Sequence, residues 1–392
     1  MMQITRKHIQ AVITYILIIV FALSFLYVGN RIASDDLDIL QNEFAPPTVE
    51  AQVIRVLYVA QADEMDWWEG TTIYFEARVT NGELRGEVLA VTQMIDDFWA
   101  GNVREVTRGD RILITSFMDD EWHFMEHVRF HTILLLGGIF IVLLLLFGRM
   151  KGLSTILSLG FTCVAVFAVF LPAILSGRNI YLAALLVCVY AALVTIFLVN
   201  GINRKSFAAV IGCLGGMAAA ALLTFVTGAV LGLTGVVSGE SMHLLHLPLE
   251  PAIDLRAIIF AGIIIGAVGA VMDVAVSIAS ALWELRENAP DLSFKSIFRS
   301  GINIGKDVMA SMTNTLVLAY IGSSLSVILL LIIHAGSLTE LLNRELVIVE
   351  FLKAMIGSLG LLFTMPLSAL ICAVLYVGKN GEKTENTETE IV

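Results

Sequence analysis

A single carboxylate interrupts the stretch FAGIIIGAVGAVMDVAVSIASAL, residues 260–282, which otherwise consists of apolar, glycine and other small residues. That carboxylate is Asp273. An acid at membrane depth costs free energy unless it is paired, protonated or facing a water-filled cavity, so it marks a functional site by default. Asp273 is therefore the first candidate for chemistry, as a group that binds and releases a proton.

Small and polar residues accompany Asp273 along one side of a predicted helix. They recur at intervals of four, three, four, four and three residues and so share one helix face: Gly262, Gly266, Gly269, Asp273, Ser277 and Ser280. A face of this kind lets another helix approach closely. We therefore expect helix packing at Gly262, Gly266, Gly269 and Ser277, and we expect the acid to lie inside the helix bundle.

The next apolar span, DVMASMTNTLVLAYIGSSL, carries the polar triplet Thr313, Asn314 and Thr315. If both helices meet the membrane surface near Leu282 and Lys306, about nine residues inward reaches Asp273 on one helix and the triplet on the other. The three side chains are then level with the acid. Two interpretations remain open: a proton site whose neighbours reorganise, and a structural hydrogen bond that joins two helices.

A second acid, Asp307, is predicted to begin that span, where a carboxylate favourably meets the helix dipole. The helical rise places it about 13 Å in depth from Asp273. An intramembrane aspartyl protease needs two carboxylates facing each other at one depth, which this spacing does not provide. The sequence also has no nucleotide-binding loop, nucleophile elbow or HExxH motif. We therefore expect no enzymatic activity and no cofactor.

Histidines provide the one candidate for a metal site. The best local pair is His243 and His246, with Glu240 and Glu250 nearby, because imidazole is a common metal ligand and titrates near neutrality. The alternative is that these histidines lie at the membrane interface. Six of the seven histidines are predicted to lie on the outer side: His123, His127, His131, His243, His246 and His334.

The composition determines the class of protein that must position these residues. Of 392 residues, 57% are hydrophobic and 15% are charged, which no soluble globular domain requires. Apolar runs long enough to cross a bilayer give eight candidate spans: about 10–29, 131–148, 153–173, 180–200, 206–233, 256–282, 307–334 and 347–377. Most of the basic residues in the connections fall on one side, so the positive-inside rule places both termini in the cytoplasm.

The first span is interpreted as an uncleaved anchor that delivers the following segment to the outside. There, TVEAQVIRVLYV, TTIYFEARVTNGELRGEVLAV and VREVTRGDRILITSF show β-branched alternation broken by turn residues, which predicts about five strands. The fold class is thus a mostly α integral membrane protein with a small OB-like or SH3-like barrel between its first two spans. The predicted domains are an anchor (1–30), a β domain (45–125), a seven-helix membrane domain (131–377) and a cytoplasmic tail (378–392).

The β domain contains an acidic run with two interpretations: a lip that binds a cation or ligand, and a solvated loop with two anchoring tryptophans. The run comprises Asp63, Glu64, Asp66, Trp67, Trp68 and Glu69. The sequence shows neither a basic groove nor an aromatic platform, so we expect no nucleic-acid partner. The expected partner of the whole chain is the lipid bilayer.

The layout of the whole chain resembles the YibE/F family of bacterial multi-span proteins, in its longer, YibE-like form. The resemblance is carried by GRMKGLSTILSLGFTCVAVFAVFLPAIL and GAVGAVMDVAVSIASALWEL, together with the anchor and the outer β domain. It implies a location in the bacterial cytoplasmic membrane and a hetero-oligomer with a shorter YibF-like relative. The resemblance does not indicate which biochemical activity the protein has.

Residues of about 262–376 also resemble the last three helices of the SecF export subunit and its relatives in the RND superfamily. The corresponding pieces are Asp273 with LRENAP, then SMTNT, then IGSLGLLFTMPLSALI. Those proteins use proton flow to drive transport. The resemblance implies that Asp273 is a proton site with Thr313, Asn314 and Thr315 as its hydrogen-bonding neighbours.

The sequence is therefore compatible with two functions. The first is a proton-linked transporter or export factor of unknown substrate. The second is a non-transporting scaffold or sensor whose outer β domain binds an envelope partner. A solvated path to Asp273 favours transport, and a dry contact between Asp273 and Asn314 favours the scaffold.

Overall fold

The computed structural model describes residues 2–34, 46–61, 70–96, 103–116, 121–237, 239–247 and 252–376, with side chains from residue 12 onward. The chain divides into two compact units, residues 1–37 together with 147–392, and residues 38–146. We call them the helical unit and the β unit. The predicted acidic run and the predicted tail at 378–392 lie outside the described residues.

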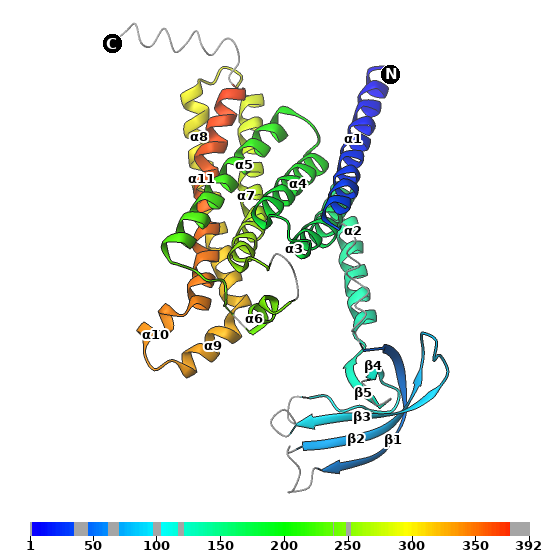
Figure 1. Ribbon diagram of the computed structural model, residues 1–392. Coiled ribbons are helices and arrows are strands. Elements are labelled where there is room, and N and C mark those ends of the chain that lie inside the picture. Colours follow the sequence, from blue (N-terminus) through cyan, green and yellow to red (C-terminus); the bar gives the residue numbers. More distant parts are fainter. Residues whose placement is uncertain are drawn as a thin grey trace, which may run out of the picture. The chain divides into compact units, whose positions relative to one another are not determined.

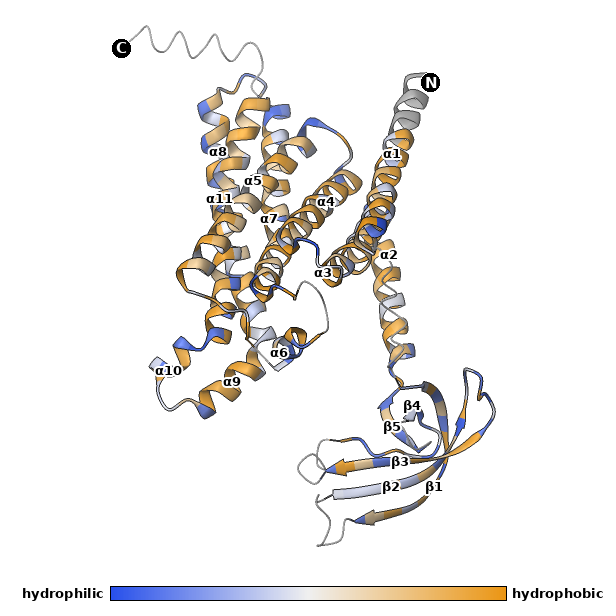
Figure 2. Cartoon of the chain, in the orientation of Figure 1, coloured by the Kyte–Doolittle hydropathy of each residue, from blue (hydrophilic) through white to orange (hydrophobic). Residues whose placement is uncertain are grey.

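Long apolar helices dominate the chain, as Figure 2 shows. In chain order (Figure 1) the long helices are α1 (Met2–Ala33), α2 (Phe130–Ala165), α4 (Ile180–Asn200), α5 (Arg204–Val230), α7 (Leu255–Asn288), α8 (Phe294–Ser323) and α11 (Glu345–Tyr376). The short ones are α3 (Leu171–Leu175), which follows the π-helical turn Val166–Phe170, α6 (Gly239–Leu245), α9 (Leu325–His334) and α10 (Leu338–Asn343). These helices are those of a membrane protein.

Within the described residues, six helices are long and apolar enough to span a membrane, or seven if the bent pair α8 and α9 forms one span. The sequence predicted eight, because it separated spans 131–148 and 153–173. In the structure both lie within one run of 46 residues, Phe130–Leu175, which consists of two helices that meet at a kink. The kink falls between the two predicted spans, so the count of eight stays a prediction. The run is broken at Arg149, whose φ of 48° and ψ of -126° lie in a region that glycine favours.

Capping side chains explain where several helices begin. The side chain of Asn203 accepts a hydrogen bond from the Ser206 backbone N–H at 2.8 Å, and Asp254 accepts one from the Arg256 N–H at 3.0 Å. Such caps satisfy backbone donors that the first helical turn leaves free. They place the starts of α5 and α7 within about two residues of the predicted spans.

The core of the helical unit surrounds α11, which contacts α5, α7 and α8 (Figure 1). Helix α7 contributes fully buried side chains to this core, including Ile263, Ile264 and Val271. The large apolar face of α7 is therefore the one that packs within the chain. Its opposite face carries the candidate proton site.

The β unit holds a closed five-stranded barrel within its described residues. The strands are β1 (Thr48–Gln61), β2 (Gly70–Val79), β3 (Val88–Asp96), β4 (Arg111–Ser116) and β5 (Trp122–His127). Strand β1 pairs antiparallel with both β2 and β4, and β3 pairs parallel with β5. This Greek-key order favours the OB-like alternative over the SH3-like one. Phe75, Ile112 and Ile114 fill the interior and are fully buried.

The connection from β3 to β4 is held by two polar side chains. The buried Gln93 donates to the Arg104 carbonyl at 3.0 Å and accepts from the Val106 N–H at 2.9 Å. Asp110 accepts from the backbone N–H and the hydroxyl of Thr107, each at 2.9 Å. Burial opposes ionisation of Asp110, but the Thr107 hydrogen bonds and the nearby Arg104 charge outweigh it and lower the pKa of this carboxyl. These hydrogen bonds hold the connection between β3 and β4 in one conformation.

Candidate functional site

Asp273 lies near the middle of α7, on the face that the chain leaves uncovered. Asp273 is exposed, and so are the glycines Gly262, Gly266 and Gly269 on the same face. Ser277 is half-buried. Within the part of the chain that the structure describes, no hydrogen bond or ion pair holds the Asp273 carboxylate. We call these five residues the α7 stripe.

The predicted burial of the α7 stripe inside the bundle is wrong for the single chain. A Cβ atom built on Gly262 or Gly269 would have no other heavy atom within 4 Å, whereas one on Gly266 would meet the hydroxyl of Tyr320 on α8. The reason is that α7 packs through its larger apolar side chains, which bury more surface. The small face consequently stays exposed among the described residues.

Two close approaches define how α7 and α8 run past each other. Gly301 of α8 lies against Leu282 of α7, and Gly305 lies against Ile278. A Cβ atom on Gly305 would come within 3.1 Å of Cδ1 of Ile278. From the first contact to the second, the position moves four residues forward on α8 and four residues back on α7. The two helices are therefore antiparallel.

This register corrects the predicted level of the polar triplet. Asp273 lies opposite about Ala310, so Thr313, Asn314 and Thr315 are displaced by about 5–8 Å along the helix axis. The Thr315 hydroxyl donates to a carbonyl of its own helix at 3.0 Å. Within the described residues, therefore, no hydrogen bond links the triplet to Asp273. Its proposed role beside the acid stays a prediction.

Asp307 does not begin a helix, so that prediction is wrong. Helix α8 starts at Phe294 behind a cap from Ser293, because the amphipathic segment and the apolar span form one continuous helix. Asp307 is therefore only about one turn in depth from Asp273, not 13 Å. Gly305 packs on α7, and Asp307 is two residues further along α8. Two residues correspond to a rotation of about 200° around the helix, so Asp307 faces away from α7. The two acids do not form the facing pair of an aspartyl protease.

A second polar cluster lies where α8 ends, and sequence reasoning did not identify it. Helices α8 and α9 meet at a bend of 62°. At the bend, the Ser324 hydroxyl donates to Oε2 of Glu350 on α11 at 2.5 Å. Lys353 Nζ contacts Oε1 of the same carboxylate at 2.6 Å. Nearby, the buried Tyr320 hydroxyl has no hydrogen-bond partner among the described residues.

The signal for this cluster was present in the sequence. Glu350 and Lys353 are three residues apart within the predicted apolar span 347–377, and residues at this spacing share a helix face. Opposite charges inside a membrane span pair with each other and mark functional or structural polar sites. The bend itself gave no comparable signal, since Ser323 and Ser324 are compatible with a continuous helix.

Comparison with protein families identifies the class of chain that carries this geometry. A family model described as YibE/F-like protein matches residues 136–378, which is more than half of the chain. The protein belongs to the YibE/F-like family. Comparison with the curated proteins and with the solved structures found no match.

The YibE/F-like region contains all the candidate residues of the helical unit. Asp273, the polar triplet and the ion pair of Glu350 and Lys353 all fall within residues 136–378, whereas strands β1 to β5 precede its first residue. The family assignment therefore covers the proposed proton site. The barrel has to be interpreted from its own residues.

Close helix packing in this YibE/F-like protein occurs between α5 and α11, where the sequence analysis did not place it. Gly212 and Gly216 are four residues apart on α5 and lie against Ser368 and Thr364 of α11. Both hydroxyl residues are fully buried. The sequence signal was GxxxG within an apolar helix, which permits close backbone approach.

The predicted histidine pair lies at the end of α6. Nδ1 of His246 is 2.8 Å from the Met242 carbonyl, so this ring nitrogen already has a partner. Glu250 lies outside the described residues, and Glu240 has a polar partner of its own. Among the described residues, no three His, Cys, Asp or Glu side chains gather as a metal site would require. Metal binding by His243 and His246 stays a prediction.

Proposed function

We propose that this YibE/F-like protein is a proton-linked membrane transporter or export factor rather than an enzyme, with Asp273 as the group that takes up and releases the proton. The observation that supports the proposal is the lone position of Asp273, near the middle of α7 and without a counter-charge in the described chain. The free energy of such a carboxylate depends strongly on whether water or hydrocarbon faces it. Its protonation can therefore be coupled to a rearrangement of its surroundings.

The uncovered α7 stripe supports a further element of the proposal, a partner subunit. Gly262 and Gly269 leave room for another backbone to approach, and small residues favour such approach in membranes. A second helix placed there would also shield Asp273 from lipid. We propose a shorter YibF-like relative as the source of that helix, in the bacterial cytoplasmic membrane with both termini in the cytoplasm.

The break between α8 and α9 also supports transport. Non-helical backbone at membrane depth is tolerated where protein or a water-filled cavity surrounds it, and broken helices form the binding sites of many transporters. Here Ser324 lies at the break and donates to Glu350. In the proposal, Thr313, Asn314 and Thr315 line the α8 segment between this break and the level of Asp273.

A second candidate function is a non-transporting scaffold or sensor whose outer β domain binds an envelope partner. A hollow on the surface of the barrel favours it. The scaffold hypothesis also predicts a direct contact between Asp273 and Asn314. In the described part of the chain the two side chains are both exposed and no hydrogen bond joins them, which favours the transporter.

Proton flux in vesicles tests the proposal. The full-length protein is reconstituted with a pH-sensitive dye inside and an imposed pH gradient outside. We expect wild-type protein to dissipate the gradient and Asp273→Asn, which keeps the shape and removes the titratable proton, to slow the flux at least tenfold. Asp307→Asn, a matched change on the far side of α8, should retain the wild-type rate. Equal rates for wild type and Asp273→Asn, including no rate above protein-free vesicles in either, would overturn the proposal.

A further inference from the structure

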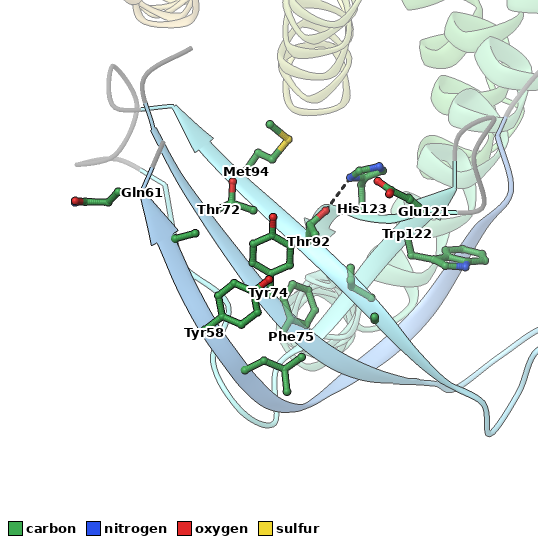
Figure 3. Close-up of a pocket in the computed structure, with 14 residues that line it drawn as sticks. Tyr58, Gln61, Thr72, Tyr74, Phe75, Thr92, Met94, Glu121, Trp122 and His123 are labelled. Carbon is green, nitrogen blue, oxygen red and sulfur yellow. Dashed lines mark hydrogen bonds between the residues drawn. The ribbon is translucent and has the colours of Figure 1, made fainter. Parts of the chain in front are cut away.

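The barrel has a hollow of about 720 Å³ on the outer surface of its sheet. Its lining comes from β1, β2, β3 and the beginning of β5, all within the β unit (Figure 3). This volume lies within the range of small-molecule sites, which is about 300–1,000 Å³. Nothing proposed for Asp273 involves these residues.

A row of side chains crosses four strands at the floor of the hollow. The strand register pairs Tyr58 of β1 with Tyr74 of β2, Tyr74 with Thr92 of β3, and Thr92 with His123 of β5. The two tyrosine rings stack with centroids 4.4 Å apart at 17°, and Thr92 Oγ1 is 2.9 Å from His123 Nδ1. Figure 3 shows this row, with Met94 of β3 beside Thr72 of β2. The row thus joins an aromatic surface to a hydrogen-bonded polar pair.

The stacked tyrosines remain available to a ligand. Tyr58 is 56% exposed, so much of its ring faces solvent. Tyr74 is half-buried beneath this exposed ring. A stacked aromatic pair on a pleated sheet forms a flat apolar surface whose hydroxyl groups provide donors and acceptors at its edge. Thr72, which also lines the hollow, adds another hydroxyl. A ligand seated here therefore meets an apolar floor with polar groups around it.

The charge of the lining restricts the chemical class of that ligand. The described residues around the hollow include no lysine or arginine, and Glu121 is their single acid. Nucleic acids depend on basic side chains that neutralise their phosphates. A polyanion is therefore disfavoured, although this sheet face of OB barrels binds both oligonucleotides and oligosaccharides.

We propose that this hollow binds an uncharged oligosaccharide. One face of a sugar ring presents C–H groups that pack on an aromatic ring, and its edge presents hydroxyls that need hydrogen bonds. The tyrosine pair supplies the first requirement, and Thr72 and Glu121 supply the second. The proposal concerns the β unit alone and does not rest on whether the helical unit transports protons.

The test is a binding measurement on the full-length protein in lipid nanodiscs. Alkyl maltoside detergents must be removed, because their head groups belong to the proposed ligand class. Calorimetric titration uses neutral tetrasaccharides of glucose and of N-acetylglucosamine as probes, with an oligothymidine and an apolar peptide as competing classes. We expect at least one tetrasaccharide to bind, and we expect neither competitor to bind more tightly.

Variants locate the binding. Tyr74→Ala should weaken binding at least tenfold, while Tyr74→Phe, which keeps the ring, should stay within about threefold of wild type. Tyr58→Ala, at a more exposed position, provides a second test if Tyr74→Ala perturbs the barrel. Val88→Ala, an exposed change on β3 outside the hollow, is the matched control and should bind as wild type does.

Three results would overturn the inference. The first is that wild-type protein binds neither tetrasaccharide. The second is that Tyr58→Ala binds the tetrasaccharide as tightly as wild type does. The third is that the oligothymidine or the apolar peptide binds more tightly than either sugar.

Discussion

Replacing Gly216 with leucine is expected to prevent the helical unit from folding stably. A Cβ atom at this position would overlap the Thr364 hydroxyl and would lie 2.9 Å from Thr364 Cβ and 3.1 Å from the Gly360 carbonyl oxygen. Because backbone as well as side chain is in the way, α5 and α11 would have to separate. Overpacking costs about 1–3 kcal/mol even for added methylenes in a well-packed core, and leucine adds more than that.

The measurement for Gly216→Leu is the thermal midpoint of the protein in nanodiscs, followed by size-exclusion chromatography. Gly228→Leu is the matched control, because Gly228 is on the same helix and a Cβ atom there would meet nothing within 4 Å. We expect the control to keep a wild-type midpoint and Gly216→Leu to give little folded protein. A wild-type midpoint for Gly216→Leu would show that α5 and α11 do not approach as described.

Removing the positive charge from the polar cluster at the α8 bend is expected to destabilise the protein by about 1–3 kcal/mol. The Lys353→Met change leaves the Glu350 carboxylate, whose side chain is 16% exposed, without its counter-charge. Breaking a fully buried pair costs about 3–5 kcal/mol, and an exposed pair contributes about 0–1 kcal/mol. The intermediate exposure of this pair sets the expected loss between these limits.

A double-variant cycle separates the charge from the shape of the side chains. Glu350→Gln combined with Lys353→Met removes both charges and should recover most of the stability lost in Lys353→Met. Thermal midpoints of the three variants and wild type provide the four values of the cycle. Additive losses would contradict a direct interaction between Glu350 and Lys353.

Local features of this fold were predictable from sequence because their causes are local. Asn203 and Asp254 mark the starts of α5 and α7 through caps that depend on a few adjacent residues. The alternation in TTIYFEARV, which lies within β2, similarly predicted a strand that is buried on one side. Composition was enough to identify a chain of long apolar helices.

Features that depend on which surfaces meet were not predictable. The α7 stripe and the Gly212–Gly216 face both have the small residues that close packing needs, yet among the described residues the second packs against a helix along its length, and the first meets only Tyr320, at Gly266. The deciding factor is the set of larger side chains on the other faces of each helix, such as Ile263 and Ile264. Asp307 was misplaced for a related reason, since two segments of opposite character joined into one helix.

The tyrosine pair shows the same limit in the β unit. Tyr58 and Tyr74 are neighbours only because of the pairing of β1 with β2, and that register shifts between Val56 and Tyr58. A shift by one residue turns a side chain to the other face of a sheet. For this reason no aromatic platform was predicted from the sequence, although both tyrosines are present in it.

The most direct test of the account is an infrared titration of the full-length protein in nanodiscs, because the central claim is that Asp273 exchanges a proton. A protonated carboxylic acid has a C=O stretching band that its carboxylate lacks. Because the chain has 35 Asp and Glu residues, the signal of Asp273 is the difference between the titrations of two proteins. We predict that the pH-dependent spectrum of Asp273→Asn lacks one reversible band of this kind, which wild type and Asp307→Asn both show. An identical pH-dependent spectrum in wild type and Asp273→Asn would contradict the account.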